Sequence, residues 1–487
     1  MAKIKFKGID LTQEQVNAVL LGRTKEDLKI EAYAGSGKTF LLRVLAELFR
    51  QQGRSCIYLA FNKPVALEAE SLFQSNPNVE CSTAHSLAYK AVGWKYKDKL
   101  LMGKLNGSAL IRLVDVGPEL LLPKVAKANM IIDTIEKFCQ SADKQIQPDH
   151  VPFMDMKNEN GSEPAKIQEE RKEIVRVAKR IWEEMSDPKG IVPITHNGYL
   201  KIWGLSQPRI RKDVIFFDEA QDANGAMLDI VSRQTHCQRI FVGDRYQQLY
   251  AWNGAVNAMQ KIQTANTCQI SQSFRFGNAI ARKANEILNS YLEPEVPIKI
   301  KGNPDKNSRL AHILTPDAVL CRTNGMVIAK TFEFLGNSKV YIQGGTQSLT
   351  GLLKAVEDLK SGKRTSHSEL SLFESWEELK DYSDTKSGQG VKSLVNIVER
   401  FGTRKLINVL YKTCDSPAKA QTIISTVHKA KGLEWERVIL ADDFKYPKDK
   451  DSVIPAEEVN VLYVAITRAL HQLDVSDCRA ANPIGYS

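Results

Sequence analysis

Short apolar runs alternate with amphipathic stretches in the first part of the chain. Strands are predicted at LKIEAYA, which begins at Leu28, at SCIYLAF, and at a short segment that reaches Thr83. A glycine-rich loop follows the first strand and leads into a helix, which has leucines at helical spacing on one face and ends at Gly53. Another helix opens with Pro64 in its first turn. This alternation predicts a parallel sheet covered by helices.

Apolar strands return further along the chain, at VIFF (Val214 to Phe217) and RIFVG (Arg239 to Gly243). A second series includes AVLC (Ala318 to Cys321), VYIQG, TIIST and RVILAD (Arg437 to Asp442). A helix from about Glu457 to Leu470 and a last strand near QLDVS complete it. We therefore expect a second α/β unit.

Two mostly helical stretches interrupt these series. A basic one runs from about Gly93 to Gly190, and a polar one runs from about Leu349 to Ala418. The second stretch contains a portion rich in Ser, Lys, Asp and Gly, near Asp384 to Gly390, that is typical of a loop or hinge. Both stretches have roughly the size of a small domain, so they are predicted to be insertions.

The composition excludes a membrane protein. The 487 residues are 43% hydrophobic and 25% charged, and no run of about 18 apolar residues is present to span a bilayer. The N-terminal MAKIKFKGID is basic but has no apolar segment behind it, as a signal peptide would. We expect several compact units, and a location in the cytoplasm or, in a eukaryotic host, in the nucleus.

The charge balance favours a polyanionic partner. The formal net charge is +10, and each Lys or Arg that neutralises a phosphate releases a condensed counterion. The eight cysteines form no CxxC pair and have no histidine at zinc-finger spacing, so they are predicted to be reduced and mostly buried. Charge alone leaves open whether the protein binds nucleic acid.

The segment AYAGSGKT (Ala32 to Thr39) follows a predicted strand and opens a helix, which is the context of a phosphate-binding loop. Glycines let backbone N–H groups approach the phosphates, Lys38 reaches the β- and γ-phosphate oxygens, and Thr39 can hold Mg²⁺. Ala32 stands where the pattern has glycine. The residues predicted to contact the nucleotide here are Ala34, Gly35, Ser36, Gly37, Lys38 and Thr39.

A pair of acidic residues ends a buried strand in VIFFDEAQD. Packing explains such residues poorly. With the phosphate loop upstream, Asp218 is predicted to hold magnesium through water, and Glu219 to orient and deprotonate the attacking water. A solvated strand end is the alternative for this pair taken alone. The two motifs together predict an NTPase but do not say what the energy is used for.

Other segments indicate that use. In chain order they are LTQEQ, the phosphate loop, LAFNKPVA, STAHSLAY, THNGYLKIW, FFDEAQD, VGDRYQQLYAWNGA, SQSFRFG, LCRTN, STVHKAKGLEW and NVLYVAITRA. With these segments the sequence resembles the UvrD/Rep branch of superfamily-one helicases, and within it the helicase part of the F-box DNA helicases, to which THNGYLKIW and SQSFRFG point. No F-box-like segment precedes Leu11, so only the motor is expected to be shared.

The resemblance implies an α/β fold with two RecA-like P-loop domains, each with a parallel sheet and a mainly helical insertion. The expected segments are 1–92 and 191–276 for the first motor domain, 93–190 for its insertion, 277–348 and 419–487 for the second motor domain, and 349–418 for its reduced insertion. ATP and Mg²⁺ are the implied cofactors, with ATP bound between the domains and single-stranded DNA across both.

The resemblance also implies nucleotide contacts outside the phosphate loop. Arg275 and Arg468 match the two arginine fingers of the family, whose guanidinium groups stabilise developing phosphoryl charge. The other matching positions are Gln15 for the adenine edge, Phe274 for stacking on the base, Gln247 for the γ-phosphate, and Gly432 and Glu434 facing the nucleotide. Outside its motif, a lone arginine is usually a surface charge.

On the DNA side, the matching positions are Phe61, Tyr250 and Trp252 for base stacking, and Thr83, His85, Arg322, Asn324, Thr426 and His428 for the backbone. Aromatic platforms beside basic groups suit single strands, although core packing is the alternative for any one aromatic. Asn253 stands where the family usually has arginine. The basic, aromatic stretch from Lys90 to Lys99 is either a further DNA contact or a solvated helix face.

The expected function is that of an ATP-dependent helicase that moves on single-stranded DNA, with the 3′-to-5′ polarity that the resemblance implies. Single-strand/double-strand junctions are expected substrates, and a protein partner is possible. Two alternatives stay open. One is a translocase that strips proteins from single strands, which the small second insertion favours. The other is a nucleotide-gated DNA-binding subunit of a larger complex.

Overall fold

A computed structural model of the chain describes residues 5–483 except 102, 104, 153–163, 250–253, 255–256, 366, 368, 371–372, 386–387 and 448–452. The chain divides into two compact units. Unit 1 comprises Met1–Glu31, Lys38–Arg245 and Tyr250–Gln269, and unit 2 comprises Ala32–Gly37, Tyr246–Leu249 and Ile270–Ser487. In the described parts of the chain, no helix is long and apolar enough to cross a membrane.

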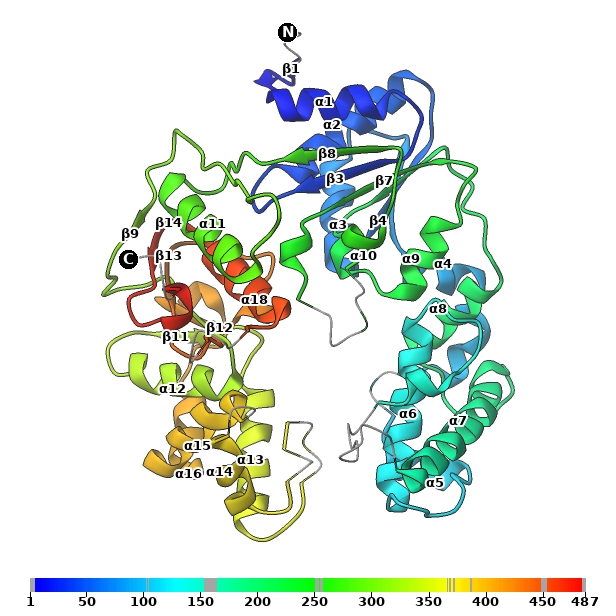
Figure 1. Cartoon of the computed structure of the whole chain (residues 1–487), viewed down its shortest axis with the longest axis vertical. Coiled ribbons are helices and arrows are strands. Elements are labelled where there is room, and N and C mark those ends of the chain that lie inside the picture. The colour runs from blue at the N-terminus through cyan, green and yellow to red at the C-terminus, as the bar shows by residue number, and fades with distance from the viewer. Residues whose placement is uncertain are drawn as a thin grey trace. The chain divides into compact units, whose positions relative to one another are not determined.

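Unit 1 is built on a six-stranded sheet (Figure 1). In spatial order its strands are β5 (Val79–Thr83), β4 (Cys56–Ala60), β6 (Val214–Phe217), β7 (Gln238–Gly243), β3 (Leu28–Ala32) and β8 (Asn266–Ile270). The first five run parallel. Glu31 of β3 pairs with Gly243 of β7, so the residues after β3, β6 and β7 emerge at one edge of the sheet. Ligands of parallel α/β sheets bind at this carboxyl edge.

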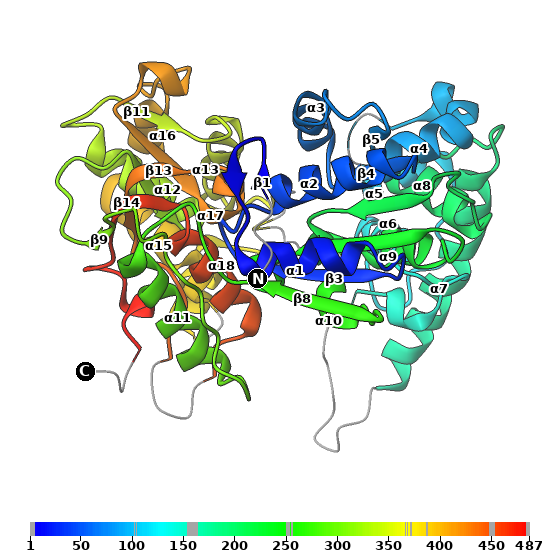
Figure 2. The ribbon, with the colours of Figure 1, turned by 90° about the horizontal axis from the view of Figure 1, so that it is seen from above.

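Apolar side chains at helical spacing bury one face of the helices of this unit. In α2 (Lys38–Gln51), Leu41, Leu42 and Leu45 are fully buried. The other helices of the sheet region are α1 (Gln13–Gly22), α3 (Lys63–Leu72), α4 (Ala84–Ala91), α8 (His196–Leu205), α9 (Gly225–Ser232) and α10 (Ala258–Lys261). Helix α1 contacts α2 of the same unit, and Figure 2 shows both helices from above.

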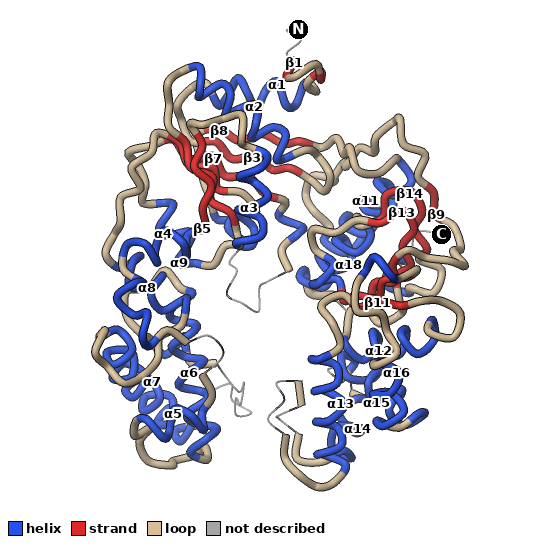
Figure 3. The backbone as a smooth tube through the Cα atoms, turned by 180° about the vertical axis from the view of Figure 1, so that it is seen from behind, coloured by secondary structure: helices blue, strands red, loops and turns tan. Residues whose placement is uncertain are grey.

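The first insertion is helical, as its sequence predicts. It comprises η1 (Gly93–Lys99), α5 (Gly107–Leu113), α6 (Lys124–Gln140), η2 (Pro148–His150) and α7 (Ala165–Ser186), and α5, α6 and α7 lie together in Figures 1 and 3. The buried apolar side chains from Leu110 to Val192 form a cluster of their own, whereas Tyr96 of η1 belongs to the cluster of the sheet region. Helices α5, α6 and α7 therefore pack around a separate core within unit 1.

Unit 2 contains the second six-stranded sheet, shown in red in Figure 3. Its order is β11 (Val340–Ile342), β12 (Thr422–Thr426), β10 (Ala318–Cys321), β13 (Trp435–Leu440), β14 (Ala469–Asp474) and β9 (Arg309–Leu310), and all neighbours run parallel. Its helices are α11 (Asn278–Leu292), α12 (Asn324–Phe334), α17 (Val427–Ala430) and α18 (Ala456–Ile466). Two parallel-sheet α/β units are present, which confirms the predicted fold class.

The second insertion packs differently from the first. It comprises α13 (Gln347–Lys360), α14 (Trp376–Ser383), α15 (Gln389–Phe401) and α16 (Thr403–Leu410). Leu353 and Leu406 belong to one hydrophobic cluster with Val319 of β10, Ile342 of β11 and Ile424 of β12. The insertion and the sheet of unit 2 therefore share a core.

The predicted strands are confirmed, but one predicted helix boundary is corrected and some strands were not predicted. The helix predicted to reach Leu470 ends at Ile466, because the side chains of Thr467 and Arg468 donate to carbonyl groups of its last turn and the chain enters β14 at Ala469. Strands β8 and β9 were not predicted. The remaining short elements are β1 (Lys5–Phe6), β2 (Ile9–Asp10), η3 (Ala220–Asp222), η4 (Arg245–Gln247), η6 (Pro417–Lys419) and η7 (Arg479–Ala481).

The cysteines agree with the sequence analysis. All eight are free thiols, and five of them are buried: Cys56, Cys139, Cys268, Cys321 and Cys478. Burial raises the pKa of the Cys56 thiol to about 12. A thiol with so high a pKa is a poor nucleophile, so these cysteines behave as small apolar residues.

Candidate functional site

The phosphate loop joins β3 to α2 and depends on two glycines. Gly35 and Gly37 have φ angles of +71° and +78°, which residues with a side chain rarely adopt. A Cβ at Gly35 would also overlap the side chains of Ser273 and Arg275. Ala32, the departure from the usual pattern, is the last residue of β3 and is fully buried, so its methyl group packs inside the sheet.

The first part of the loop belongs to unit 2 by its contacts. The backbone N–H of Phe274 donates to the Gly35 carbonyl at 2.7 Å. The backbone N–H of Ala34 donates to the hydroxyl of Tyr463, a fully buried residue of α18, at 3.1 Å. The loop backbone is thus hydrogen-bonded to the backbone of Phe274 and to the side chain of Tyr463, both of which are more than 200 positions away in the sequence.

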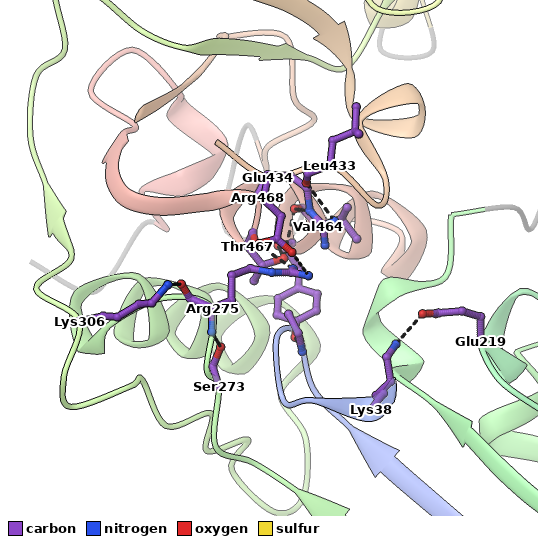
Figure 4. Close-up of polar contacts among 12 residues, drawn as sticks. Lys38, Glu219, Ser273, Arg275, Lys306, Leu433, Glu434, Val464, Thr467 and Arg468 are labelled. Carbon is purple, nitrogen blue, oxygen red and sulfur yellow. Dashed lines mark hydrogen bonds and ion pairs between the residues drawn. The ribbon is translucent and has the colours of Figure 1, made fainter. Parts of the chain in front are cut away.

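Lys38, the first residue of α2, makes an ion pair within unit 1. Its Nζ donates to Oε1 of Glu219 at 2.8 Å (Figure 4). Burial acts to lower the pKa of Lys38, but the carboxylates of Glu219, Asp218 and Asp244 outweigh it and raise the pKa above its ordinary value. The lysine is therefore a fixed positive charge at neutral pH.

Asp218 follows β6 directly and is almost completely buried. Burial, and then the neighbouring carboxylate of Glu219, raise its pKa, whereas Lys38 and a hydrogen bond from Tyr58 oppose the rise. The Tyr58 hydroxyl donates to Oδ2 of Asp218 at 2.6 Å. This contact from β4 orients the carboxylate at the carboxyl edge of the sheet.

Sequence reasoning did not single out three residues of this cluster. Tyr58 bonds to Asp218, the side chain of Gln221 lies against Glu219, and Asp244 contributes to the charge around Lys38. A signal was present, since Tyr58 and Gln221 are polar groups in segments otherwise predicted to be buried, and buried polar groups need partners. Their partners could not be read from the sequence.

Arg275 is held by groups of unit 2 (Figure 4). Its Nη2 lies 2.7 Å from Oε1 of Glu434, and its Nη1 donates to the carbonyl of Thr467 at 3.2 Å. Its own carbonyl accepts from Lys306 Nζ at 2.8 Å. The structure therefore brings together Arg275 and Glu434, both predicted to contact the nucleotide.

Arg468 is one of the largest fully buried side chains of the described chain. Its Nε donates to the Val464 carbonyl at 3.1 Å, and its Nη1 donates to the Leu433 carbonyl at 3.4 Å. The sequence showed no structural role for this arginine, but these contacts provide one. They tie the end of α18 to the segment just before Glu434.

The remaining predicted nucleotide residues lie as follows. Gln15 is buried in the first turn of α1, and its Oε1 accepts from the Thr12 N–H at 3.0 Å, so the hydrogen bond engages the amide oxygen rather than the amide nitrogen. Phe274 is 43% exposed, as a ring that stacks on a base would need to be. The Gln247 carbonyl accepts from Lys431 Nζ, and Gly432 has a φ of +88°.

The donors in these clusters fit a polyphosphate. The Lys38 ammonium has three N–H groups, of which the ion pair with Glu219 uses one. Among the described residues, the Ser36 hydroxyl and the Arg275 Nε are buried without a hydrogen-bond partner. The oxygens of Thr39 and Asp218 are the hard ligands that Mg²⁺ prefers. Within unit 1, Lys38, Thr39 and Asp218 therefore suit a phosphate group that carries magnesium.

Three predicted DNA contacts are described in unit 1. Phe61 follows β4 and is partly buried. The Thr83 hydroxyl caps α4 by accepting from the Ser86 N–H at 3.0 Å. His85 Nε2 lies 3.0 Å from Asn197 Oδ1, and burial is the main cause that lowers the pKa of His85. His85 is therefore mostly neutral at pH 7.

In unit 2, two predicted DNA contacts are engaged by carboxylates. Arg322 makes a bidentate pair with Glu458, with bonds of 2.8 and 2.9 Å. Asn324 Nδ2 donates to Glu369 at 2.7 Å. A DNA phosphate would have to compete with these acids for the same donors.

Two further predicted DNA contacts lie at the start of α17. Thr426 is buried at its N-terminus, and His428 lies in the helix. Burial, together with the charge of Arg322, lowers the pKa of His428 to about 4. At neutral pH the His428 ring is therefore uncharged and would contact DNA through hydrogen bonding rather than through charge.

Tyr250, Trp252 and Asn253 lie outside the described residues. The basic stretch from Lys90 to Lys99 is described, and Trp94 in η1 is 55% exposed, with Lys95 Nζ 6.0 Å from its ring centre. Glu183, Glu184 and Asp187 lie in the segment to which this stretch is hydrogen-bonded. The surface thus carries both signs of charge.

Comparison with known proteins agrees with this geometry. The family described as UvrD/REP helicase N-terminal domain matches residues 11–266, and that described as UvrD-like helicase C-terminal domain matches residues 269–480. The chain is 34% identical to F-box DNA helicase 1 of Gallus gallus over 91% of its own length and 46% of that protein. It is 29% identical to F-box DNA helicase protein 1 of Schizosaccharomyces pombe over 93% of its length and 56% of that protein. The chain thus spans about half the length of these relatives, and the resemblance seen in the motifs is confirmed.

Proposed function

The chain belongs to the UvrD/REP helicase family. We therefore propose that it is an ATP-driven motor that moves along single-stranded DNA and separates the strands of duplex DNA. The observation that carries the proposal is the ion pair between Lys38 and Glu219, two residues that are 181 positions apart. Burying an ion pair costs desolvation energy and rarely stabilises a fold. A phosphate-binding lysine beside an acidic strand end is better explained by hydrolysis than by stability.

In the proposed reaction, Lys38 binds the β- and γ-phosphate oxygens with the N–H groups that Glu219 does not use. Glu219 orients the attacking water and accepts its proton. A magnesium ion held by Thr39 and Asp218 would neutralise charge on the phosphates. Tyr58 keeps the Asp218 carboxylate in place for this task.

Arg275 and Arg468 are proposed to act on the same nucleotide as arginine fingers. Arg275 presents a guanidinium group whose orientation is set by Glu434 and the Thr467 carbonyl. A guanidinium group holds its N–H donors in one plane at fixed positions, which suits the planar arrangement of phosphoryl oxygens in the transition state. Contacts with the base and the γ-phosphate are proposed for a further set: Gln15, Phe274, Gln247 and Gly432.

We further propose that hydrolysis alters the grip of the two units on DNA and so produces 3′-to-5′ stepping. The proposed substrates are single strands and single-strand/double-strand junctions. The proposed contacts are Phe61, Thr83, His85, Tyr250, Trp252, Arg322, Asn324, Thr426 and His428. Support comes from the net positive charge, which favours a polyanionic partner.

The test is ATPase activity with and without single-stranded DNA, beside a strand-displacement assay. Lys38→Ala should abolish turnover and weaken nucleotide binding, whereas Glu219→Gln should abolish turnover and leave nucleotide bound. Lys29→Ala is a matched control, because Lys29 makes a similarly buried ion pair with Glu31 in the same unit. ATP hydrolysis by Glu219→Gln at the native rate would refute the assignment of Glu219 as the base. ATP hydrolysis by the native protein without movement along DNA would favour a nucleotide-gated DNA-binding subunit.

A second candidate is a translocase that strips bound proteins from single strands. The second insertion favours it, because this short insertion shares one core with β10, β11 and β12. Its described helices therefore pack as part of unit 2 rather than as a separate body that could act on duplex DNA. Displacement of streptavidin from biotinylated single strands, compared with strand displacement on the same preparation, distinguishes the two functions.

A further inference from the structure

Gln221 lies two residues after Glu219 and is completely buried. Its Nε2 donates to Oε2 of Glu219, and its Oε1 accepts from the backbone N–H of Asp244 at 3.1 Å. We propose that Gln221 is a positioning residue that aims the Glu219 carboxylate at the attacking water by tying it to the end of β7. The inference rests on the proposed role of Glu219 as the base.

The two oxygens of Glu219 have different partners. Oε2 receives the amide of Gln221, whereas Oε1 receives the ammonium group of Lys38 at 2.8 Å. An amide is neutral, so it can orient a carboxylate without neutralising it. Gln221 therefore fixes the rotation of the carboxylate and leaves Oε1 on the side of the phosphate-binding lysine, where the water has to be deprotonated.

The backbone around Glu219 is also constrained. Glu219 has a φ of +50°, in the left-handed region that residues with a side chain rarely occupy. Such conformations are strained and persist where the surroundings hold them. Here the N–H of Asp222 donates to the Glu219 carbonyl at 2.9 Å and closes the turn η3. Gln221 lies inside this turn, so its side chain returns directly to Glu219.

Gly243 supplies an independent observation. Its φ is not among the positive values, so the backbone does not require glycine at this position. A Cβ there would instead overlap Oε1 of Gln221 and lie 3.0 Å from Met259 Cγ. The last residue of β7 is therefore explained by the space that the Gln221 amide needs. Asp244, which follows, begins the segment that continues to Gln247.

The test compares Gln221→Met with Gln234→Met. Gln234 is an equally buried glutamine of unit 1, which donates to the carbonyls of Pro208 and Ile230 and accepts from the Ile210 N–H. Both changes should lower thermal stability to a similar extent. Only Gln221→Met should lower kcat, by roughly 10- to 100-fold, because small misplacements of a catalytic group cost about this much. KM for ATP and affinity for a non-hydrolysable analogue should stay within about twofold.

Two further variants keep the inference open to refutation. Gly243→Ala displaces the Gln221 amide without removing a polar group, and this variant should lower kcat as Gln221→Met does. If Gln221→Met does not fold, the kcat of Gly243→Ala tests the inference instead. In a Glu219→Gln background, Gln221→Met should change the residual single-turnover rate by less than about twofold, because the two residues act as a unit.

The inference is overturned if Gln221→Met and Gly243→Ala turn over at the native rate per folded molecule while Glu219→Gln is inactive. The proposed function would then stand. It is also overturned if nucleotide affinity falls together with kcat, since that pattern indicates a purely structural role. A Glu219→Gln variant with native turnover would instead refute the proposed base itself.

Discussion

Tyr58→Phe removes a single hydroxyl group from the interior of unit 1. That hydroxyl donates to Asp218 at 2.6 Å, and both side chains are more than nine-tenths buried. A hydrogen bond to a charged group contributes about 1.5–3 kcal/mol. Because each 1.4 kcal/mol is a factor of about ten in an equilibrium, Asp218 should bind a proton roughly ten times more tightly, or more, once the bond is lost.

The direction of the effect follows from the charges around Asp218. Burial and the Glu219 carboxylate already raise the pKa of Asp218, while Lys38 and the Tyr58 hydrogen bond oppose the rise. Removing one opposing contact raises the pKa further. If ionised Asp218 is needed to hold magnesium, the acid limb of the profile of ATPase rate against pH should move to higher pH, with the rate at alkaline pH largely retained.

The assay is DNA-stimulated ATPase activity from mildly acidic to mildly alkaline pH, with thermal unfolding of the same preparations. Tyr96→Phe is the matched control, because the Tyr96 hydroxyl is also buried in unit 1 and donates to the Ser186 carbonyl at 2.7 Å. It should lower stability by about 1 kcal/mol and leave the pH profile unchanged. Superimposable profiles of Tyr58→Phe and the native protein would refute the role of the hydroxyl at Asp218.

Three other predictions concern residues elsewhere in the site. Arg275→Ala should retain nucleotide affinity and lower turnover by about 10³-fold or more, and lysine at this position should restore little of it. Arg437→Ala is the control, because it removes a comparable ion pair with Asp317 and should leave turnover unchanged. Normal turnover of Arg275→Ala would contradict its proposed role as an arginine finger. Trp252→Ala should weaken single-strand binding by about 1–3 kcal/mol in a fluorescence anisotropy titration, and lower stability with unchanged affinity would mark a core residue. The pKa of His428 is about 4 in the folded protein and 6.5 in the unfolded chain, so on acidification the unfolded chain binds the proton first. Up to about 3 kcal/mol of the free energy of unfolding should therefore be lost as the pH falls from 6.5 to 4. Chemical denaturation of His428→Gln over the same pH range should show a smaller loss of stability.

The sequence by itself determined the features that depend on neighbouring residues. The strands and helices follow from apolar spacing, and the phosphate loop follows from Gly35 and Gly37, because positive φ angles are a local requirement. Asp218 and Glu219 could be placed at the end of a strand because they directly follow the apolar run of β6 in the sequence. The ordered motifs were sufficient for the family, since each motif is a short continuous segment.

Only the tertiary structure decided which side chains meet. The register of β3, β6 and β7 brings Lys38 to Glu219, and Tyr58 reaches Asp218 from the neighbouring strand β4. Arg468 could not be recognised as a buried residue, because its Nε and Nη1 donate to backbone carbonyls, which every residue has and no sequence pattern marks. The shared core of the second insertion was equally hidden. Apolar spacing shows which face of a helix is buried, but the surface that covers that face depends on how distant strands pair.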